Sequence, residues 1–226
     1  MDAEARETLA ARYREVLKGV PPEVTLVAVS KTRSVDEIKA LYDLGHRAFG
    51  ENYPQELREK QPQLPADIEW HFIGHLQTNK VKYIAPFVHL VHGVDSLKLL
   101  DELDHRAAQN GRVQEVLLQV HIAREDTKHG FAADEVLALA AEAWSWKNLE
   151  VRGLMGMASN TPDRAQVQHE FEALRTLFDK LASDLGPRFD TLSMGMSADA
   201  QEALAAGSTL LRVGTAIFGE RHYSAG

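Results

Sequence analysis

The sequence contains no cysteine at any of its 226 positions. This absence excludes disulfide bonds, a thiolate nucleophile and a cysteine-ligated zinc site. Long apolar runs are also lacking, because no window approaches the ~18–20 apolar residues of a membrane span. The first residues, MDAEARETLAARYREVL, are charged and helical in pattern and lack the apolar centre of a secretion signal. We therefore expect a soluble, cytoplasmic protein with no membrane partner.

A net positive charge is lacking as well. The chain has 33 acidic and 25 basic residues and a formal net charge of -8, so we expect no nucleic-acid partner. There is no internal repeat, no low-complexity tract and no linker rich in glycine, proline or serine. Because 44% of the residues are hydrophobic, the chain can bury a full core. We expect one domain over residues 1–226.

Short apolar runs alternate with amphipathic segments along the chain. We predict strands at Thr25–Lys31, Arg47–Asn52, Trp70–Gly74, Leu90–Asp95, Glu115–Ile122, Val151–Ala158, Thr191–Met196 and Leu210–Gly214. We predict helices at Asp2–Leu17, Val35–Leu44, Ser96–Asn110, Asp134–Trp146 and Arg164–Leu185. The stretch Pro54–Pro65 is predicted to be an irregular loop, although its charged first part can form a short helix. Alternation of this kind is typical of parallel strands joined by right-handed crossovers. Eight strands favour a single α/β domain, a closed (β/α)8 TIM-type barrel, with an extra N-terminal helix across one end.

The first predicted strand ends on a lysine. The segment LVAVSKTRS, at Leu26–Ser34, begins with an apolar run typical of a strand buried on both faces. Lys31 follows that run, at the carboxyl end of a strand, where barrels of this type carry their active sites. An amine there can form a Schiff base if its pKa is lowered enough to leave it neutral. Taken alone, a lysine at the end of a strand is more often a solvated residue that begins a loop, and nothing local separates the two interpretations.

The last two predicted strands lead into small and hydroxyl-bearing residues, in the segments LSMGMSADA and LLRVGTAIFGE. Ser197 and Thr215 offer hydroxyl groups, and Gly214 lets the backbone approach a ligand closely. The loops after strands seven and eight commonly bind phosphate in this fold, although serine and threonine also serve as helix caps. A lysine facing such a phosphate site suits either a sugar phosphate, as in lysine-dependent aldolases, or pyridoxal 5'-phosphate (PLP).

Several motifs closely resemble those of the YggS/PROSC family of PLP homeostasis proteins. They are AVSKTRS (Ala28–Ser34), FGENYPQE (Phe49–Glu56), WHFIGHLQTNK (Trp70–Lys80), GLMGM (Gly153–Met157), LSMGMSAD (Leu192–Asp199) and GSTLLRVGTAIFGER (Gly207–Arg221). They run from the first strand to the last, so the resemblance covers essentially the whole chain. Pro54 stands where the family pattern has a valine or a similar residue, which puts only that loop in question.

The resemblance implies the residues of a PLP site. Lys31 would hold PLP as a Schiff base, and Asn52 would lie beside the pyridine ring. The phosphate would be held by Ser197, Gly214 and Thr215.

Arg212 stands two residues before Gly214, where the related alanine racemase barrel places an arginine against the pyridine nitrogen. Arginine keeps its proton, so it disfavours protonation of that nitrogen and makes PLP a poorer electron sink. A salt bridge within the barrel is the alternative role for Arg212.

Three functions remain open on these grounds: a PLP carrier without substantial catalysis, a racemase-like PLP enzyme, and an aldolase acting on a sugar phosphate. Racemases of this fold take a second base from an additional domain and a partner subunit. We expect no such domain here, and no tyrosine is an obvious substitute, although Tyr53 follows Asn52. The carrier is therefore the leading hypothesis, with PLP and PLP-dependent apo-enzymes as partners, a monomeric chain and no catalytic residue.

The histidines do not indicate a metal site in the sequence. His71 and His75 have the four-residue spacing that binds zinc on a helix, but they fall on a strand and its following loop. His121 and His129 flank the segment IAREDTK, to which the resemblance gives no secure role. We expect structural roles for three other polar residues, Asp95, Glu125 and Lys128.

Overall fold

The computed structural model describes residues 1–125, 128–141 and 145–220, and its eight strands form one closed, parallel barrel in sequential order. The strands are β1 (Thr25–Val29), β2 (Ala48–Glu51), β3 (Glu69–Phe72), β4 (Leu90–Val94), β5 (Gln114–Val120), β6 (Leu149–Gly156), β7 (Thr191–Ser193) and β8 (Leu210–Val213). The barrel closes where β8 pairs with β1, with Leu210 beside Thr25. The predicted (β/α)8 fold is confirmed.

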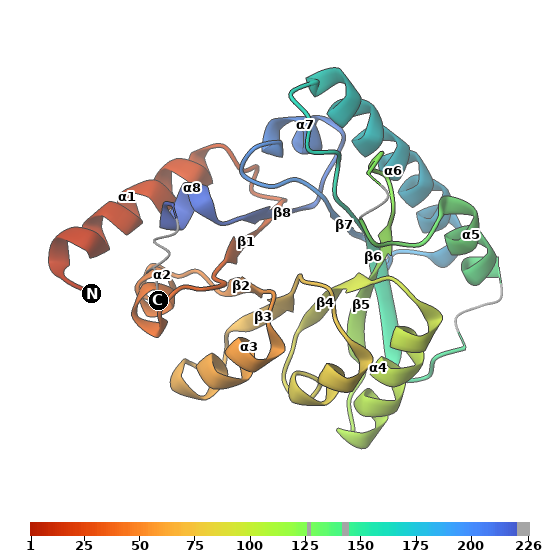
Figure 1. Ribbon diagram of the computed structural model, residues 1–226, viewed down its shortest axis with the longest axis horizontal. Helices are drawn as coiled ribbons and strands as arrows, with labels where there is room; N and C mark the ends of the chain where they lie inside the picture. The colour runs from red at the N-terminus through yellow and green to blue at the C-terminus, as the bar shows by residue number, and fades with distance from the viewer. Residues whose placement is uncertain (126–127, 142–144, 221–226) are drawn as a thin grey trace.

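Helices surround the barrel on all sides (Figure 1). They are α1 (Ala3–Lys18), α2 (Val35–Asp43), α3 (Pro54–Lys60), α4 (Leu97–Gln109), α5 (Ala133–Ala141), α6 (Arg164–Leu185), α7 (Ala200–Ala205) and α8 (Thr215–Phe218), with two 3-10 turns, η1 (Gln61–Gln63) and η2 (Thr78–Tyr83). The five predicted helices correspond to α1, α2, α4, α5 and α6. The last part of the predicted segment Asp134–Trp146 includes residues 142–144, which lie outside the described residues.

The position of α1 differs from the expected one. This helix packs against α8 and α2 in the outer layer, rather than across an end of the barrel (Figure 1). It buries Leu9, Ala10 and Tyr13. The helix that follows β8 has only four residues, so α1 supplies the outer cover that a full-length eighth helix would give.

The stretch Pro54–Pro65 is largely helical: its charged first part forms the short helix that the sequence allowed, and a 3-10 turn follows where an irregular loop was expected. Pro54 is the first residue of α3, a position that suits proline because its fixed φ matches the helix and no N–H is needed there. The charged residues that follow continue the helix to Lys60. Across the described residues, no helix is both long enough and apolar enough to span a bilayer.

Two hydrophobic clusters follow from the alternation of side chains along the strands. The larger cluster lies between the strands and the helices. The smaller one consists of buried strand residues together with Met157, and its buried members are Val27, Ala48, Leu90, Leu117, Met155 and Leu210. Buried polar residues accompany them, namely His71, His92, Ser193 and Arg212. Cavities lie at both ends of the barrel, and each contains one end of this polar series.

Candidate functional site

All six residues that the sequence suggested for ligand binding line one cavity of about 320 Å³ at the carboxyl end of the barrel. They are Lys31, Asn52, Ser197, Arg212, Gly214 and Thr215. The sequence did not single out the other six lining residues, which are Val29, Arg33, Ile73, Met157, Met196 and Ala198. Five of these six are apolar, all except Arg33, so the cavity has an apolar wall as well as polar groups.

Lys31 is held by its two chain neighbours. Ser30 is fully buried and donates its hydroxyl hydrogen to Glu51 Oε1 over 2.7 Å. On the other side, the N–H of Thr32 donates to Glu56 Oε1 over 2.6 Å. Thr32 has φ of 64°, which is unusual for a β-branched residue and marks a strained turn. The backbone around Lys31 is therefore fixed in an unusual conformation at the rim of the cavity.

A buried ion pair supports this turn from behind. The ammonium group of Lys60 lies 2.8 Å from Glu51 Oε1 and 2.6 Å from Glu56 Oε1, and it also donates to the carbonyl of Ser30. Burial raises the pKa of the Glu51 carboxyl, although the Lys60 charge opposes this shift. Lys60 thus joins α3 to both sides of the Lys31 turn. The sequence does not single out Lys60, because a lysine at the end of a charged segment has the pattern of any surface lysine.

Arg212 projects from β8 into the barrel and is only 4% exposed. Its guanidinium donates to the carbonyls of Ser193 and Gly156, over 2.9 and 3.0 Å, and to the hydroxyl of Ser193. Burial lowers its pKa to about 10, so it stays charged at neutral pH. Among the described residues no carboxylate forms an ion pair with Arg212, so the salt bridge considered from the sequence is not what holds it.

Asn52 follows β2 and contributes an unsatisfied group to the cavity. Its Oδ1 atom is buried and has no hydrogen-bond partner among the described residues. A buried carbonyl oxygen without a partner costs about 1–3 kcal/mol. A ligand donor in the cavity would remove that cost.

The ends of β7 and β8 form the third part of the site. Ser197 and Thr215 are exposed, and the helices beside them, α7 and α8, have no side-chain cap hydrogen bond. The interpretation of these residues as helix caps is therefore not supported. A Cβ atom at Gly214 would approach Val29 Cβ to 3.2 Å, so glycine allows close packing here. The N–H groups of Thr215 and Ala216 have no backbone partner within the described chain.

The ionisable residues of the cavity lining are all basic. Among the described residues, the lining contains Lys31, Arg33 and Arg212, but no carboxylate, histidine or tyrosine. Arg33 donates to the carbonyl of Gly219, so it also fixes the chain after α8. Tyr53 is 52% exposed and does not line the cavity. The site is thus positively charged and well suited to an anion.

The remaining polar residues named from the sequence lie in separate contacts. His71 pairs with His92, whereas His75 pairs with Asp95, so the two histidines do not face each other. His129 stacks on His75 with ring centroids 4.4 Å apart.

The segment from His121 to His129 is described except for residues 126–127. His121 Nε2 lies 2.9 Å from the carbonyl of Glu125, and Lys128 donates to the carbonyl of Ala158. These contacts agree with the structural roles expected for Glu125 and Lys128.

The chain matches the family model described as the alanine racemase N-terminal domain over residues 5–222. A protein of Vibrio alginolyticus named pyridoxal phosphate homeostasis protein is 42% identical over 223 residues, which cover 96% of this chain and 95% of that protein.

Solved structures agree with these sequence matches. PipY of Synechococcus elongatus, determined without PLP, superposes with a TM-score of 0.89 at 36% identity, covering 93% of this chain and all of that one. The PipY structure with PLP bound gives a TM-score of 0.85 at 35% identity over the same shares. An alanine racemase of Clostridium difficile shares only the fold, with a TM-score of 0.76 at 13% identity over 96% of this chain and 57% of the racemase.

Proposed function

The chain belongs to the alanine racemase N-terminal domain family and, within it, to the pyridoxal phosphate homeostasis proteins, and from this premise we propose that it holds PLP on Lys31 and delivers it to enzymes that need it. The observation that carries the proposal is the single cavity that gathers Lys31, Asn52, Arg212 and the residues after β7 and β8. PipY, which has this fold and is 35% identical, is known with PLP bound.

The residues of the cavity fit PLP at both of its ends. When bound, PLP supplies an aldehyde that condenses with an amine and a phosphate that binds hydrogen-bond donors. Ser197 and Thr215 offer hydroxyl donors, and the N–H groups of Thr215 and Ala216 are available beside them. The buried, unpaired Oδ1 of Asn52 is a further sign that the cavity is built for a polar ligand.

Lys31 is the only lysine among the lining residues that the structure describes. Its turn is held through Ser30 and Thr32, which keeps the backbone of Lys31 at the cavity rim. The neutral form of an amine is the form that attacks a carbonyl.

Arg212 supports storage rather than turnover. Its guanidinium is fixed by three hydrogen bonds that it donates to Ser193 and Gly156 inside the barrel, and at a pKa of about 10 it keeps its proton near neutral pH. If it lay beside the pyridine nitrogen of bound PLP, as the resemblance implies, it would disfavour protonation of that nitrogen and make the ring a weaker electron sink. We infer that the chain binds PLP as a single subunit and without an efficient catalytic cycle.

The test is borohydride reduction of the PLP-loaded chain followed by peptide mapping. We expect the label on Lys31, its loss in Lys31→Ala, and weaker, reversible PLP binding in that variant through the phosphate-binding residues. Lys82→Ala, a change at an exposed lysine, serves as the matched control and should keep full labelling. A label on Lys80, Lys82 or Lys128 would refute the assignment.

Delivery is tested separately with a PLP-free aminotransferase. The loaded chain is freed of unbound PLP by gel filtration and mixed with the apo-enzyme, whose activity should return. Unchanged, inactive apo-enzyme after prolonged mixing would contradict a role in delivery.

A further inference from the structure

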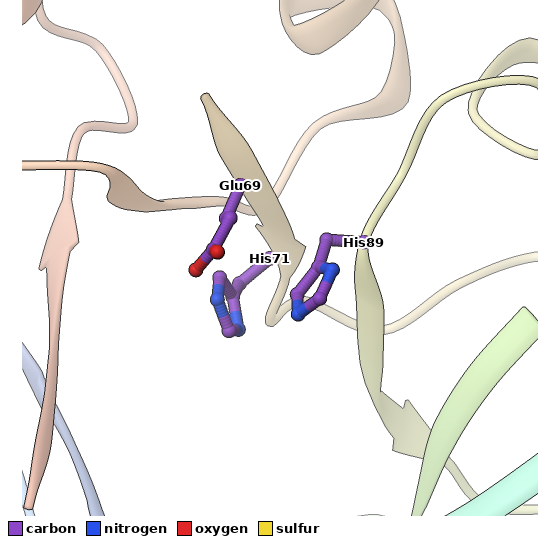
Figure 2. A group of neighbouring side chains, drawn as sticks. All are labelled: Glu69, His71 and His89. Carbon is purple, nitrogen blue, oxygen red and sulfur yellow. The ribbon is translucent and has the colours of Figure 1, made fainter. Parts of the chain in front are cut away.

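One carboxylate and one imidazole side chain of β3 face the interior of the barrel at its amino end. Glu69 and His71 are two residues apart on this strand, so their side chains point to the same face. His89 precedes β4, and its N–H donates to the carbonyl of Trp70 over 2.8 Å, which sets it beside β3. One potential ligand atom from each of Glu69, His71 and His89 lies within 4.8 Å of the others. Figure 2 shows the three side chains directed into the same space.

His71 has one ring nitrogen without a partner. The residue is 3% exposed, and its Nδ1 lies 2.9 Å from His92 Nε2. Its Nε2 is buried and has no hydrogen-bond partner among the described residues. A buried polar atom in this state usually indicates an absent ligand, ion or water. Because Nδ1 is already engaged with His92, Nε2 is the atom left for such a ligand.

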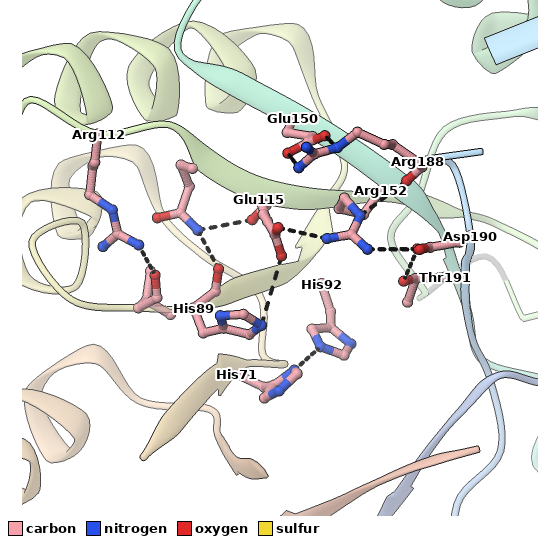
Figure 3. Close-up of polar contacts among 12 residues, drawn as sticks. His71, His89, His92, Arg112, Glu115, Glu150, Arg152, Arg188, Asp190 and Thr191 are labelled. Atoms are coloured by element: carbon pink, nitrogen blue, oxygen red, sulfur yellow. Dashed lines mark hydrogen bonds and ion pairs between the residues drawn. The ribbon is translucent and has the colours of Figure 1, made fainter. Parts of the chain in front are cut away.

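The surroundings favour a cation. A cavity of about 350 Å³ opens here, and its lining contains four carboxylates, those of Glu23, Glu69, Glu115 and Asp190, but one guanidinium, that of Arg152. Arg152 is already paired, at 2.6 Å with Glu115 and at 2.8 Å with Asp190 (Figure 3). The Glu69 carboxylate forms no ion pair with any residue that the structure describes, so no neighbouring cation compensates its charge.

We propose that Glu69, His71 Nε2 and His89 bind a divalent first-row transition metal ion such as Zn²⁺ at the amino end of the barrel. Two imidazoles and a carboxylate are a common donor set for such ions. Tetrahedral zinc ligands lie ~3.3 Å apart, given bonds of about 2.0–2.1 Å, so the three groups must close in slightly. Glu69 is exposed. His89 is half-buried and its Nε2 lies 3.7 Å from Glu115 Oε2, so Glu69 is the freer of the two side chains to make that movement.

His71 is prepared for this role by its supporting contacts. The ring is buried and its Nδ1 is engaged by His92, so its orientation is fixed with Nε2 toward the proposed ion. With the ion on Nε2, the hydrogen of His71 sits on Nδ1 and is donated to His92. His92 in turn lies 2.9 Å from the Ser193 hydroxyl. Outer contacts of this kind orient metal-binding histidines.

The experiment is calorimetric titration of Zn²⁺ into the full, untagged chain. We expect one ion bound at this site, and a loss of affinity of about tenfold or more in Glu69→Gln and in His89→Ala, since even supporting residues contribute that much. Neither variant alters a buried side chain, so both should fold.

A matched control is available at the opposite end of the barrel, where His75, Asp95 and His129 form a second, more exposed group of possible ligands. His129→Ala should leave the affinity of the proposed site unchanged. Loss of binding in His129→Ala alone, or the absence of Zn²⁺ binding, would overturn the proposal. As a direct readout, ¹⁵N NMR of the imidazoles should show the His71 Nε2 resonance shifting on Zn²⁺ addition, and an unshifted resonance would also overturn it.

Discussion

Ser197 and Thr215 hold exposed hydroxyl groups at the ends of β7 and β8 that make no cap contact. We expect Ser197→Ala and Thr215→Val each to weaken PLP binding by about 10- to 100-fold, because a hydrogen bond to a charged acceptor contributes ~1.5–3 kcal/mol. Dissociation constants from equilibrium dialysis measure the effect. Pyridoxal, which lacks the phosphate, is the control ligand and should bind both variants as it binds the parent chain. Equal losses for the two ligands would show that the hydroxyls do not contact the phosphate.

A single buried lysine, Lys60, supports the turn that carries Lys31. Lys60→Met removes the partner of Glu51, which is fully buried, and breaking a buried ion pair in this way typically costs about 3–5 kcal/mol. We expect a loss of stability of that size in urea unfolding, together with slower borohydride labelling of Lys31. Lys39→Met, at an exposed lysine that pairs with Asp43, is the matched control and should change stability by less than about 0.5 kcal/mol.

The double variant Glu51→Met with Lys60→Met separates charge from packing. Because it removes both charges, it should recover much of the stability lost in Lys60→Met. No recovery would mean that the hydrogen bond from Lys60 to the Ser30 carbonyl, rather than the ion pair, holds the turn.

At the scale of elements, the strands and long helices could be predicted because their patterns are local. The apolar run before Lys31 and the 3- and 4-residue spacing in α6 each extend over enough residues to be recognised. The short elements η2, α7 and α8 could not, because four to six residues are too few to display a period. The position of α1 was also mistaken, since nothing in its own residues specifies that it packs on α8.

The residues in and around the cavity also fall into two groups, those that the sequence could predict and those that it could not. Lys31, Gly214 and Thr215 follow strands, so a barrel brings them to one end whatever the details of packing. Lys60 and Met157 contribute through contacts that depend on side-chain packing around the turn and inside the barrel. The grouping of Glu69 with His89 depends on the register of β3 and β4, which sequence spacing does not reveal.

At the scale of the whole molecule, buried histidines make stability depend on pH. Burial lowers the pKa of His46 to about 4 and that of His71 to about 3, and it lowers that of His92 well below 6.5. Between these values and 6.5 the unfolded chain binds more protons than the folded one, so stability must fall as the pH falls. Each histidine contributes a slope of about 1.4 kcal/mol per pH unit. The raised pKa of Glu51 changes stability with pH in the opposite direction, but it is one group against the three histidines.

Urea unfolding from pH 7.5 to pH 4.5 measures this dependence. We expect His46→Gln to reduce the slope of stability against pH by the contribution of one histidine, because glutamine cannot take up a proton in the unfolded chain. His105→Gln, at an exposed histidine, should leave the slope unchanged. Stability that stays constant from pH 6.5 to pH 5 would contradict the assignment of neutral, buried imidazoles.

The whole PLP-loaded chain should also fail to turn over amino acids. The lining described for the cavity contains no carboxylate, histidine or tyrosine to act as a second base, and general-base catalysis typically contributes about 10²–10⁴-fold. Deuterium incorporation at Cα of L- and D-alanine is the measurement, and we expect it to be slow. Exchange with racemisation at ~1–10³ per second would instead identify a racemase.

The polar series His71, His92, Ser193 and Arg212 crosses an interior that barrels of this kind usually fill with aliphatic layers. Each side chain is a hydrogen-bond partner of the next. Replacing one therefore leaves its neighbour without a partner in an interior with little water, whereas replacing neighbouring members together avoids an unpaired side chain. The four positions are therefore epistatic: a substitution that is harmful alone becomes tolerable after another. During divergence such sites change jointly or stay fixed, and a combinatorial library at these positions should yield its folded members mainly as correlated replacements.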